Sequence, residues 1–328
     1  MHSHSELRFL REQTTQICSG TISSMLPTLL PKGRVVAIVD AEVDALHNIS
    51  ELIPESVLIP AGEENKNMQL VEMLWQELAD SKVGRDVFLL GVGGGVVCDI
   101  VGFVASTWMR GVRFGLVPTT LLAQVDAAIG GKCGVNFGGY KNMVGAFAPA
   151  EFVLCDAELL TTLPEREFRS ALSEMIKAAI IGDGALFELF ERNDYHALRS
   201  DATLLGEMVR RSVEVKRDIV SRDPYESGVR RLLNLGHTMA HAIESLTTEY
   251  NHGEAVAIGL AYVARKAVAQ GVLPQSDGER IVGVIERYGL PTSVELDEEA
   301  LEEAMQHDKK NRNGEIGWVM PHNIGNLF

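Results

Sequence analysis

Three histidines lie close together in the chain, with a spacing that suits metal binding. His237 and His241 are four residues apart in the run 231–260. This run has helical periodicity, so both imidazoles project from one face of a helix. His252 follows in a short polar segment, where the next apolar run begins. Helical i, i+4 histidines, joined by a further histidine or a carboxylate, suit a divalent ion such as Zn²⁺.

The alternative interpretation is that these are core histidines whose hydrogen bonds are satisfied within the protein. Three histidines beside Asn234 and Gly236 favour the metal site. The metalloprotease motif HExxH is excluded, because Thr238 stands where its glutamate would be.

Glu174 and Lys177 are three residues apart in a second segment with helical periodicity, and therefore share a helical face. Such a pair is usually an exposed ion pair. Here the neighbouring residues 175–180 are mostly apolar, which indicates burial. A buried carboxylate needs a partner, so Glu174 could complete a metal site with the histidines.

A run of glycines follows a predicted strand at residues 86–92. Gly93, Gly94 and Gly95 lead into a helix that contains Asp99. Glycines at such a turn let the backbone approach a phosphate, and the helix N-terminus supplies N–H donors. The segment is not the GxGxxG fingerprint, so a purely structural tight turn stays open as an alternative.

The polar, glycine-rich segment 124–147 is expected to be a loop that carries functional groups. It contains Asp126, Lys132, Lys141 and Asn142. The two lysines, together with Arg110, could neutralise a phosphate group. Ordinary solvated lysines are the alternative.

Two kinds of region must position these residues. Short strands at 34–40, 57–60, 86–92, 113–117 and 152–155 alternate with helices at 68–83, 94–108 and 119–129, which predicts a mainly parallel sheet. Further helices are predicted at 165–181, 186–192, 202–221, 229–246, 253–270 and 278–288, with a last helix after the acidic run 295–303 and a turn region at 308–320. We expect an α/β domain over residues 1–160, an α-helical domain over 161–328, and a cleft between them.

Composition narrows the possible functions. A net charge of −15 argues against nucleic-acid binding, which needs a basic face. No apolar run reaches membrane-spanning length. The four cysteines lack CxxC spacing, which favours reduced thiols and a cytoplasmic location.

Long stretches of the chain resemble the 3-dehydroquinate synthase family of sugar-phosphate cyclases. They are GVGGGVVCD, MRGVRFGLVPTTLLAQVDAAIGGK, YKNMVGAF, SEMIKAAI, RRLLNLGHTMAHAIE, HGEAVA and DKK, in the family's order, between residues 34 and 321. The glycine and histidine motifs are also similar to those of iron-type alcohol dehydrogenases.

The resemblance implies an NAD-binding, Rossmann-like domain and Zn²⁺, replaceable by Co²⁺, on Glu174, His237 and His252. It makes His241 a group on the substrate side rather than a ligand. The implied cofactor residues are Asp40, residues 61–66 with Glu63 and Lys66, Gly94, Gly95, Val96, Asp99, Thr119, Thr120, Lys132, Lys141, Leu159 and Thr162. Cys98 replaces the family's usual glycine in this turn.

The implied substrate is a small anionic sugar phosphate, 3-deoxy-D-arabino-heptulosonate 7-phosphate, and the products are 3-dehydroquinate and phosphate. The resemblance implies that the substrate's phosphate group contacts Arg110, Lys132, Asn142, Asn234 and His241. A ring hydroxyl would contact Asp126 and Lys177. The substrate's carboxylate would contact Lys216, Arg230 and either Lys309 or Lys310. The family also implies a homodimer in which Arg110 reaches across to the partner. Another cyclase, a metal-dependent alcohol dehydrogenase and a non-catalytic protein on the same scaffold are the competing hypotheses.

Overall fold

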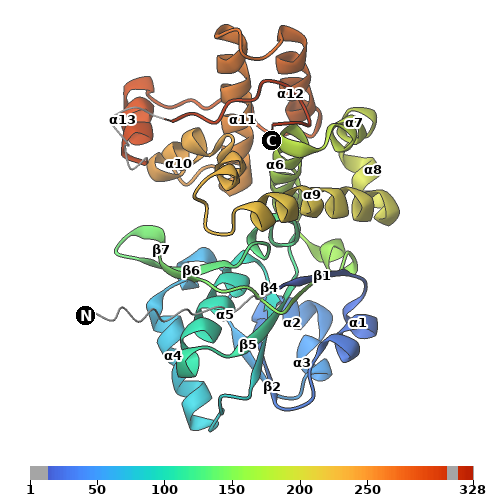
Figure 1. The fold of residues 1–328 in the computed structure, drawn as a ribbon, viewed down its shortest axis with the longest axis vertical. Helices are drawn as coiled ribbons and strands as arrows, with labels where there is room; N and C mark the ends of the chain where they lie inside the picture. Colours follow the sequence, from blue (N-terminus) through green and yellow to red (C-terminus); the bar gives the residue numbers. More distant parts are fainter. Residues whose placement is uncertain (1–13, 309–316, 328) are drawn as a thin grey trace, which may run out of the picture.

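A six-stranded parallel sheet forms the N-terminal half of the molecule (Figure 1). The computed structural model describes residues 14–308 and 317–327. The strands lie in the order β1-β8-β5-β4-β2-β3. Their bounds are Gln16–Ser19 for β1, Val35–Asp40 for β2, Ser56–Ile59 for β3, Phe88–Gly93 for β4, Arg113–Pro118 for β5 and Phe152–Cys155 for β8. The predicted parallel sheet is confirmed, but β1, an edge strand in which only Cys18 is fully buried, was not predicted.

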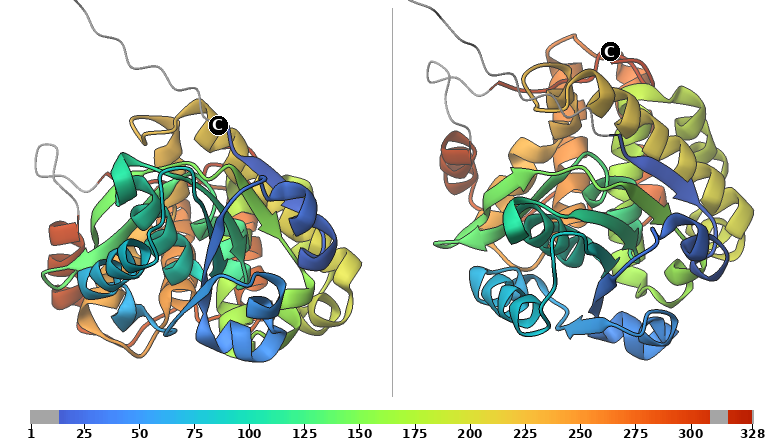
Figure 2. Two further views of the ribbon diagram at one scale, coloured as in Figure 1. Left: turned by 90° about the horizontal axis from the view of Figure 1, so that it is seen from below. Right: turned by 60° about the horizontal axis from the view of Figure 1, so that its bottom comes forward.

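Helices cover both faces of this sheet, because alternate strand side chains point to opposite sides. In β2, Val36 and Ile38 belong to one apolar core, and Ala37 and Val39 to the other. The central strand β4 is buried along its whole length, as expected for a strand covered on both faces. One side carries α1 (Ile22–Leu29), α2 (Ala41–His47) and α3 (Ile49–Leu52), and the other α4 (Met68–Asp80) and α5 (Gly95–Thr107) (Figure 2).

The C-terminal half of the described chain is helical, as predicted. Its helices are α6 (Glu165–Gly182), α7 (Gly184–Arg192), α8 (Tyr195–Ser200), α9 (Ala202–Arg222), α10 (His237–Leu246), α11 (His252–Ala269), α12 (Gln275–Arg287) and α13 (Glu298–Asp308). α6 and α9 contact the π-helical turn η3 (Ala123–Ala127), which follows β5. The helical half thus meets the sheet at the carboxyl ends of its strands. The domain boundary at residue 160 stays a prediction.

The segment 124–147 was wrongly expected to be a loop. Within it, β6 (Lys132–Phe137) and β7 (Tyr140–Phe147) form an antiparallel hairpin that turns at Gly138 and Gly139, with φ of 61° and 83°. The prediction failed because the segment is rich in glycine and polar residues, and because most of β7 is exposed and its apolar residues do not alternate regularly with polar ones. The hairpin packs on α5, where a Cβ at Gly102 would come within 2.7 Å of Cys133 Cβ.

Two predicted helices are shorter than expected. The segment 229–246 divides into the 3₁₀ turn η5 (Val229–Asn234) and α10, because Gly236 adopts φ of 80° between them. The segment 119–129 is helical only over residues 121–127, with the π-helical turn at its end. The last helix begins inside the acidic run rather than after it.

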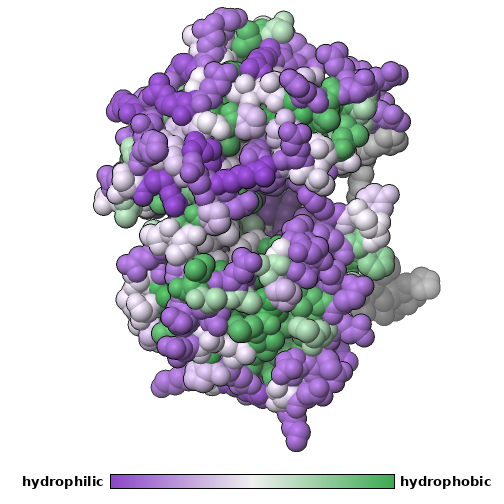
Figure 3. All heavy atoms as spheres, turned by 180° about the vertical axis from the view of Figure 1, so that it is seen from behind, coloured by the Kyte–Doolittle hydropathy of each residue, from purple (hydrophilic) through white to green (hydrophobic). Residues whose placement is uncertain are grey.

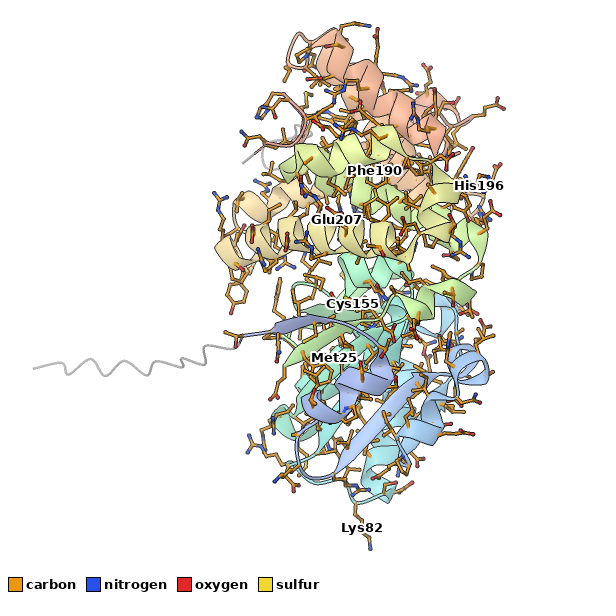
Figure 4. All side chains as sticks on the ribbon, turned by 90° about the vertical axis from the view of Figure 1, so that its right-hand side faces the viewer. Met25, Lys82, Cys155, Phe190, His196 and Glu207 are labelled. Carbon is orange, nitrogen blue, oxygen red and sulfur yellow. The ribbon has the colours of Figure 1, made fainter. Side chains whose placement is uncertain are left out.

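The two halves meet along an indentation that is visible from behind, where the cleft was expected (Figure 3). In side view, Cys155 lies near this junction, with Met25 and Lys82 on the sheet side and Phe190, His196 and Glu207 on the helical side (Figure 4). All four cysteines are free. Among the described residues, no helix is both long and apolar enough to cross a membrane.

Candidate metal centre and active site

Three helices of the C-terminal half bring one glutamate and two histidines together. Glu174 lies in α6, His237 is the first residue of α10, and His252 is the first residue of α11. The Nε2 atoms of His237 and His252 lie 3.5 and 3.4 Å from Glu174 Oε1. The possible ligand atoms of the three residues all lie within 4.8 Å of one another. This spacing suits one metal ion held by two imidazoles and a carboxylate.

In each imidazole, the nitrogen that points away from Glu174 is Nδ1, and it contacts an acceptor that fixes the orientation of the ring. Nε2 of each ring therefore faces the glutamate. His237 Nδ1 lies 3.2 Å from the carbonyl oxygen of Leu235. A carbonyl only accepts, so Nδ1 donates and Nε2 keeps its lone pair. His252 Nδ1 lies 3.4 Å from Glu244 Oε2 and is oriented in the same way. In both rings Nε2 is therefore the nitrogen directed at Glu174 Oε1, and a shared cation would be bound there by Nε2 of the two neutral imidazoles.

The environment of Glu174 also fits a metal ion. Glu174 is only 3% exposed, and neither of its oxygens accepts a well-formed hydrogen bond from the described residues. Lys177, one turn later on α6, forms an ion pair with Oε2. Burial would raise the pKa of Glu174, but Lys177 and the two histidines outweigh it and hold the pKa well below its usual range. A buried anion that is short of hydrogen bonds is a suitable donor for a divalent ion.

The pKa values of the two histidines are shifted in opposite directions. Burial, helped by Lys177, lowers the pKa of His237 to about 3, so this imidazole is in the neutral form that ligates metals. Burial also opposes the charge of His252, but Glu174 and Glu244 outweigh it and raise the pKa of His252 to about 10. A metal ion bound among these residues would displace that proton.

Glycines let the three helices approach closely enough to build this cluster. A Cβ at Gly259 of α11 would lie 2.0 Å from the carbonyl oxygen of Gly236, just before α10. A Cβ at Gly253 would lie 2.2 Å from the carbonyl oxygen of Ser170 on α6. No side chain fits at either position, so both glycines keep α11 against its two neighbours.

A second set of buried charges extends from Lys177. Asp126, in η3, accepts hydrogen bonds from Lys216 Nζ at 2.5 Å to Oδ1 and 2.7 Å to its backbone oxygen. Burial lowers the pKa of Lys216 even though Asp126 opposes the shift. Burial would raise the pKa of Asp126, but Lys216 outweighs it and leaves the pKa below its usual value. Three of the predicted substrate-side residues therefore lie next to the Glu174 cluster.

The predicted glycine turn connects β4 to α5, with Gly94 as the N-cap of the helix. A Cβ at Gly93 would lie 2.4 Å from Val97 Cγ2 and 3.1 Å from Asp40 Cβ, and one at Gly94 would lie 3.1 Å from Thr120 Cγ2. The N–H of Thr119 donates to the carbonyl of Gly93 at 2.9 Å. The hydroxyl oxygen of Thr119 is buried without a partner among the described residues. Predicted cofactor residues from three strand ends therefore surround one tight turn.

Other predicted cofactor residues lie near α5 or in the turn that follows β8. Lys66 is buried, and its Nζ lies 2.5 Å from Asp99 Oδ2 on α5. Glu63 Oε1 accepts a hydrogen bond from Asn136 of the hairpin at 2.8 Å. In the 3₁₀ turn η4 (Glu158–Thr162), Leu159 is buried and Thr162 Oγ1 lies 2.9 Å from His47 Nε2.

The cations of the hairpin contact two glutamates that sequence reasoning missed. Lys132 forms an ion pair with Glu226, which also accepts a hydrogen bond from Asn234 at 2.8 Å. Lys141 Nζ lies 2.7 Å from Glu244 Oε1. Glu244 could have been noticed, because it stands seven residues after His237, on the same helical face. Glu226 lies in a loop, so the sequence around it has no helical or strand periodicity that would have indicated its position.

The remaining predicted residues are distributed as follows. Arg230 is buried and donates to the carbonyl of Gly130 at 3.0 Å. The ring centroid of His241 lies 5.5 Å from that of His237, and Asn142 has φ of 53°. Arg110 lies beyond the C-terminal end of α5, whereas the glycine turn lies at its N-terminal end. Lys309 and Lys310 lie outside the described residues.

Two solved structures resemble this arrangement over nearly the whole chain. One is ValA, a 2-epi-5-epi-valiolone synthase from Streptomyces hygroscopicus subsp. jinggangensis with NAD⁺ and Zn²⁺ bound. It is 28% identical, with a TM-score of 0.89, over 98% of this chain and 94% of that chain. The other is 2-deoxy-scyllo-inosose synthase complexed with carbaglucose-6-phosphate, NAD⁺ and Co²⁺. It is 25% identical, with a TM-score of 0.86, over 94% of this chain and 90% of that chain. Fold and site together place the protein in the sugar-phosphate cyclase superfamily.

Sequence comparison narrows this class to one family. Residues 56–170 match the 3-dehydroquinate synthase N-terminal family model, and residues 171–311 match the C-terminal one. The 3-dehydroquinate synthase of Pelobacter propionicus is 41% identical over 94% of this chain and 90% of its own length. The chain belongs to the 3-dehydroquinate synthase family.

Proposed function

We propose that this protein is a lyase that converts 3-deoxy-D-arabino-heptulosonate 7-phosphate to 3-dehydroquinate and phosphate. The observation that carries the proposal is the Glu174, His237 and His252 cluster beside a set of buried lysines, in a chain that matches the family over both halves. A carboxylate-bearing sugar phosphate is a multiply charged anion, and a protein with a net charge of −15 needs such concentrated local cations to bind it.

Glu174, His237 and His252 would hold a divalent ion, with Zn²⁺ proposed and Co²⁺ as a substitute. The turn at Gly94 and Gly95, with Asp40, Lys66, Asp99, Thr119 and Thr120, would hold NAD⁺. When both are bound, the metal would act as a Lewis acid and NAD⁺ would take up and return one hydride. ValA, at 28% identity, carries NAD⁺ and Zn²⁺ together, which supports this pairing.

The protein's own residues would bind and orient the substrate around these groups. Lys132, Asn142 and Asn234 would hold the phosphate, and Lys216 and Arg230 the carboxylate. In the structure Lys132 contacts Glu226, and Lys216 contacts Asp126. Substrate anions would therefore compete with these carboxylates for the lysines, which favours an anion carrying more than one charge.

Proton movement would depend on residues that reach the ring and the leaving phosphate. His241 lies on the same face of α10 as His237 and would hold or accept a proton at an imidazole nitrogen. Lys177 and Asp126 would contact a ring hydroxyl. Glu174 and Asp126 keep the pKa of Lys177 above its usual value against the opposing effect of burial, so Lys177 would serve as a cationic donor of hydrogen bonds.

We further propose that the enzyme is a cytoplasmic homodimer. Four free cysteines are consistent with a reducing compartment. Arg110, which lies at the far end of α5 from the glycine turn, would complete the partner's phosphate site.

The test is release of inorganic phosphate from the heptulosonate phosphate by the purified protein. Phosphate release should require NAD⁺, should stop with a chelator, and should return when Zn²⁺ or Co²⁺ is added. Absorbance at the NADH maximum should not rise with turnover. Accumulation of one NADH per product would instead identify a net alcohol dehydrogenase.

A further inference from the structure

Glu244 contacts groups from two separate parts of the fold. It lies in α10, and its side chain is only 11% exposed. Its Oε2 lies 3.4 Å from Nδ1 of His252, at the start of α11. Its Oε1 accepts a hydrogen bond from Lys141 Nζ at 2.7 Å. Lys141 belongs to the β6–β7 hairpin, which lies next to α10 in Figure 1.

The contact with His252 is of a kind that fixes a metal ligand. A carboxylate on the far nitrogen of an imidazole sets its tautomer and ring orientation and makes the near nitrogen a better ligand. Here the near nitrogen, Nε2, is the one that faces Glu174. The 3.4 Å contact between Glu244 and Nδ1 therefore holds His252 with its ligand nitrogen toward the metal site.

The contact with Lys141 differs from an ordinary exposed ion pair. Lys141 is 58% exposed, and a pair between two exposed side chains contributes little to stability. In this pair the carboxylate is largely buried and is already held by His252. Lys141 therefore meets an acceptor whose position is set by the metal site, and movement of the hairpin would disturb that acceptor.

We infer that Glu244 is a positioning residue that orients His252 toward the metal site and anchors the β6–β7 hairpin through Lys141. The inference rests on the proposed metal site at Glu174, His237 and His252. The hairpin carries Lys132, Lys141 and Asn142, the proposed groups for cofactor and substrate. Binding of the metal would consequently restrict the hairpin before any substrate arrives.

Zinc affinity, measured by competition with a chromophoric chelator, tests the first half of this inference. Glu244→Ala should bind Zn²⁺ roughly 10- to 100-fold more weakly than the parent protein, the usual effect of losing such a partner. Glu244→Gln keeps an oxygen acceptor without the charge and should lose less. Glu249→Gln removes an exposed carboxylate just beyond the same helix and serves as the matched control, with unchanged affinity.

The possible outcomes distinguish failure of the positioning role of Glu244 from failure of the proposed metal site. If Glu244→Ala binds Zn²⁺ as tightly as the parent while His237→Ala does not bind it, the positioning role is wrong and the site stands. If His237→Ala also binds as tightly as the parent, the proposed site is wrong and the inference falls with it. Circular dichroism shows whether each variant folds. If Glu244→Ala does not fold, the zinc affinity of Glu244→Gln is compared with that of the parent protein instead.

Hydrogen–deuterium exchange tests the second half. Adding Zn²⁺ to the parent should slow amide exchange in β6 and β7, with α12 as an internal reference. Lys141→Ala should lose this slowing at saturating Zn²⁺. It should also bind Zn²⁺ more weakly than the parent, but by less than Glu244→Ala does, because a coupling between two sites acts equally in both directions. The double variant with Glu244→Ala should lose no more of the slowing. Equal slowing in Lys141→Ala and the parent would overturn the anchoring role.

Discussion

At the scale of single residues, His237 and His241 share one face of α10 but differ in their surroundings. His237 lies 3.5 Å from Glu174, whereas His241 is not a member of the Glu174 cluster. His241→Ala should therefore keep close to one zinc per chain and lose roughly 10²- to 10⁴-fold in rate, as expected for a proton-transfer group. His237→Ala should lose the metal. Elemental analysis of both variants is the measurement, and a zinc-free His241→Ala would reverse the ligand assignment.

Asp223 offers a pH-dependent test at the same scale. Its carboxylate accepts hydrogen bonds from the backbone N–H groups of Ser227, Gly228 and Arg230, which shape the loop carrying Glu226. Although burial opposes this, these bonds lower the pKa of Asp223 to about 2, below its unfolded value of about 3.9. The stabilisation is therefore fully present well above the unfolded pKa and is lost progressively as the pH falls from about 5 toward 2.

Asp223→Asn should accordingly lower the melting temperature at pH 7, because the amide accepts these bonds more weakly than the carboxylate. The gap between variant and parent should narrow as the pH falls from 5 to 3. Thermal unfolding followed across this range is the measurement. A gap that stays constant with pH would mean that the ionised carboxylate does not stabilise the loop.

At the scale of elements, the close approach of α10 and α11 depends on Gly259. A Cβ there would lie 2.0 Å from the carbonyl oxygen of Gly236, and backbone cannot move aside as a side chain can. Gly259→Ala should cost on the order of 1–3 kcal/mol of unfolding free energy and weaken zinc binding, because His237 and His252 begin these two helices. Gly283→Ala on α12 is the control, since a Cβ there meets nothing within 4 Å.

Denaturant unfolding and zinc titration of the two variants decide this prediction. Gly283→Ala should be neutral or gain up to about 1 kcal/mol, because alanine favours the helix. Gly259→Ala with parental stability and zinc affinity would show that the helices can separate without disturbing the site.

Elements also show what the sequence could and could not reveal. Strongly periodic or fully apolar segments, such as β4 and α6, were predicted to within two residues at each end. The β6–β7 hairpin was missed because its exposed strand carries no alternating apolar pattern. The break before α10 was missed because Gly236 lies inside a continuous apolar run, where only its φ of 80° reveals the turn.

At the scale of the whole molecule, the residues that could do chemistry were recognisable, but their contacts were not. Glu174, His237 and His252 were grouped from residue types, helical spacing and family resemblance. The pairing of Lys132 with Glu226 and of Lys141 with Glu244 depends on how the hairpin lies against the helical half. Contacts between residues about one hundred positions apart leave no local pattern in the sequence.

The proposed dimer can be tested by mixing two inactive variants. Arg110 lies in a short exposed segment with left-handed backbone, with φ of 46° at Met109 and 67° at Arg110, beyond the end of α5 that is remote from the glycine turn. If it completes the partner's site, Arg110→Ala and Lys132→Ala should each be nearly inactive alone. Mixed by reversible unfolding, they should regain about a quarter of parental activity, because half of the dimers would be mixed and each would hold one intact site.

Lys132→Ala mixed with Asn234→Ala is the control, since both defects lie in the chain's own site and neither site in the mixed dimer is intact. Phosphate release is the measurement, and a first mixture no more active than the control would place Arg110 outside the partner's site.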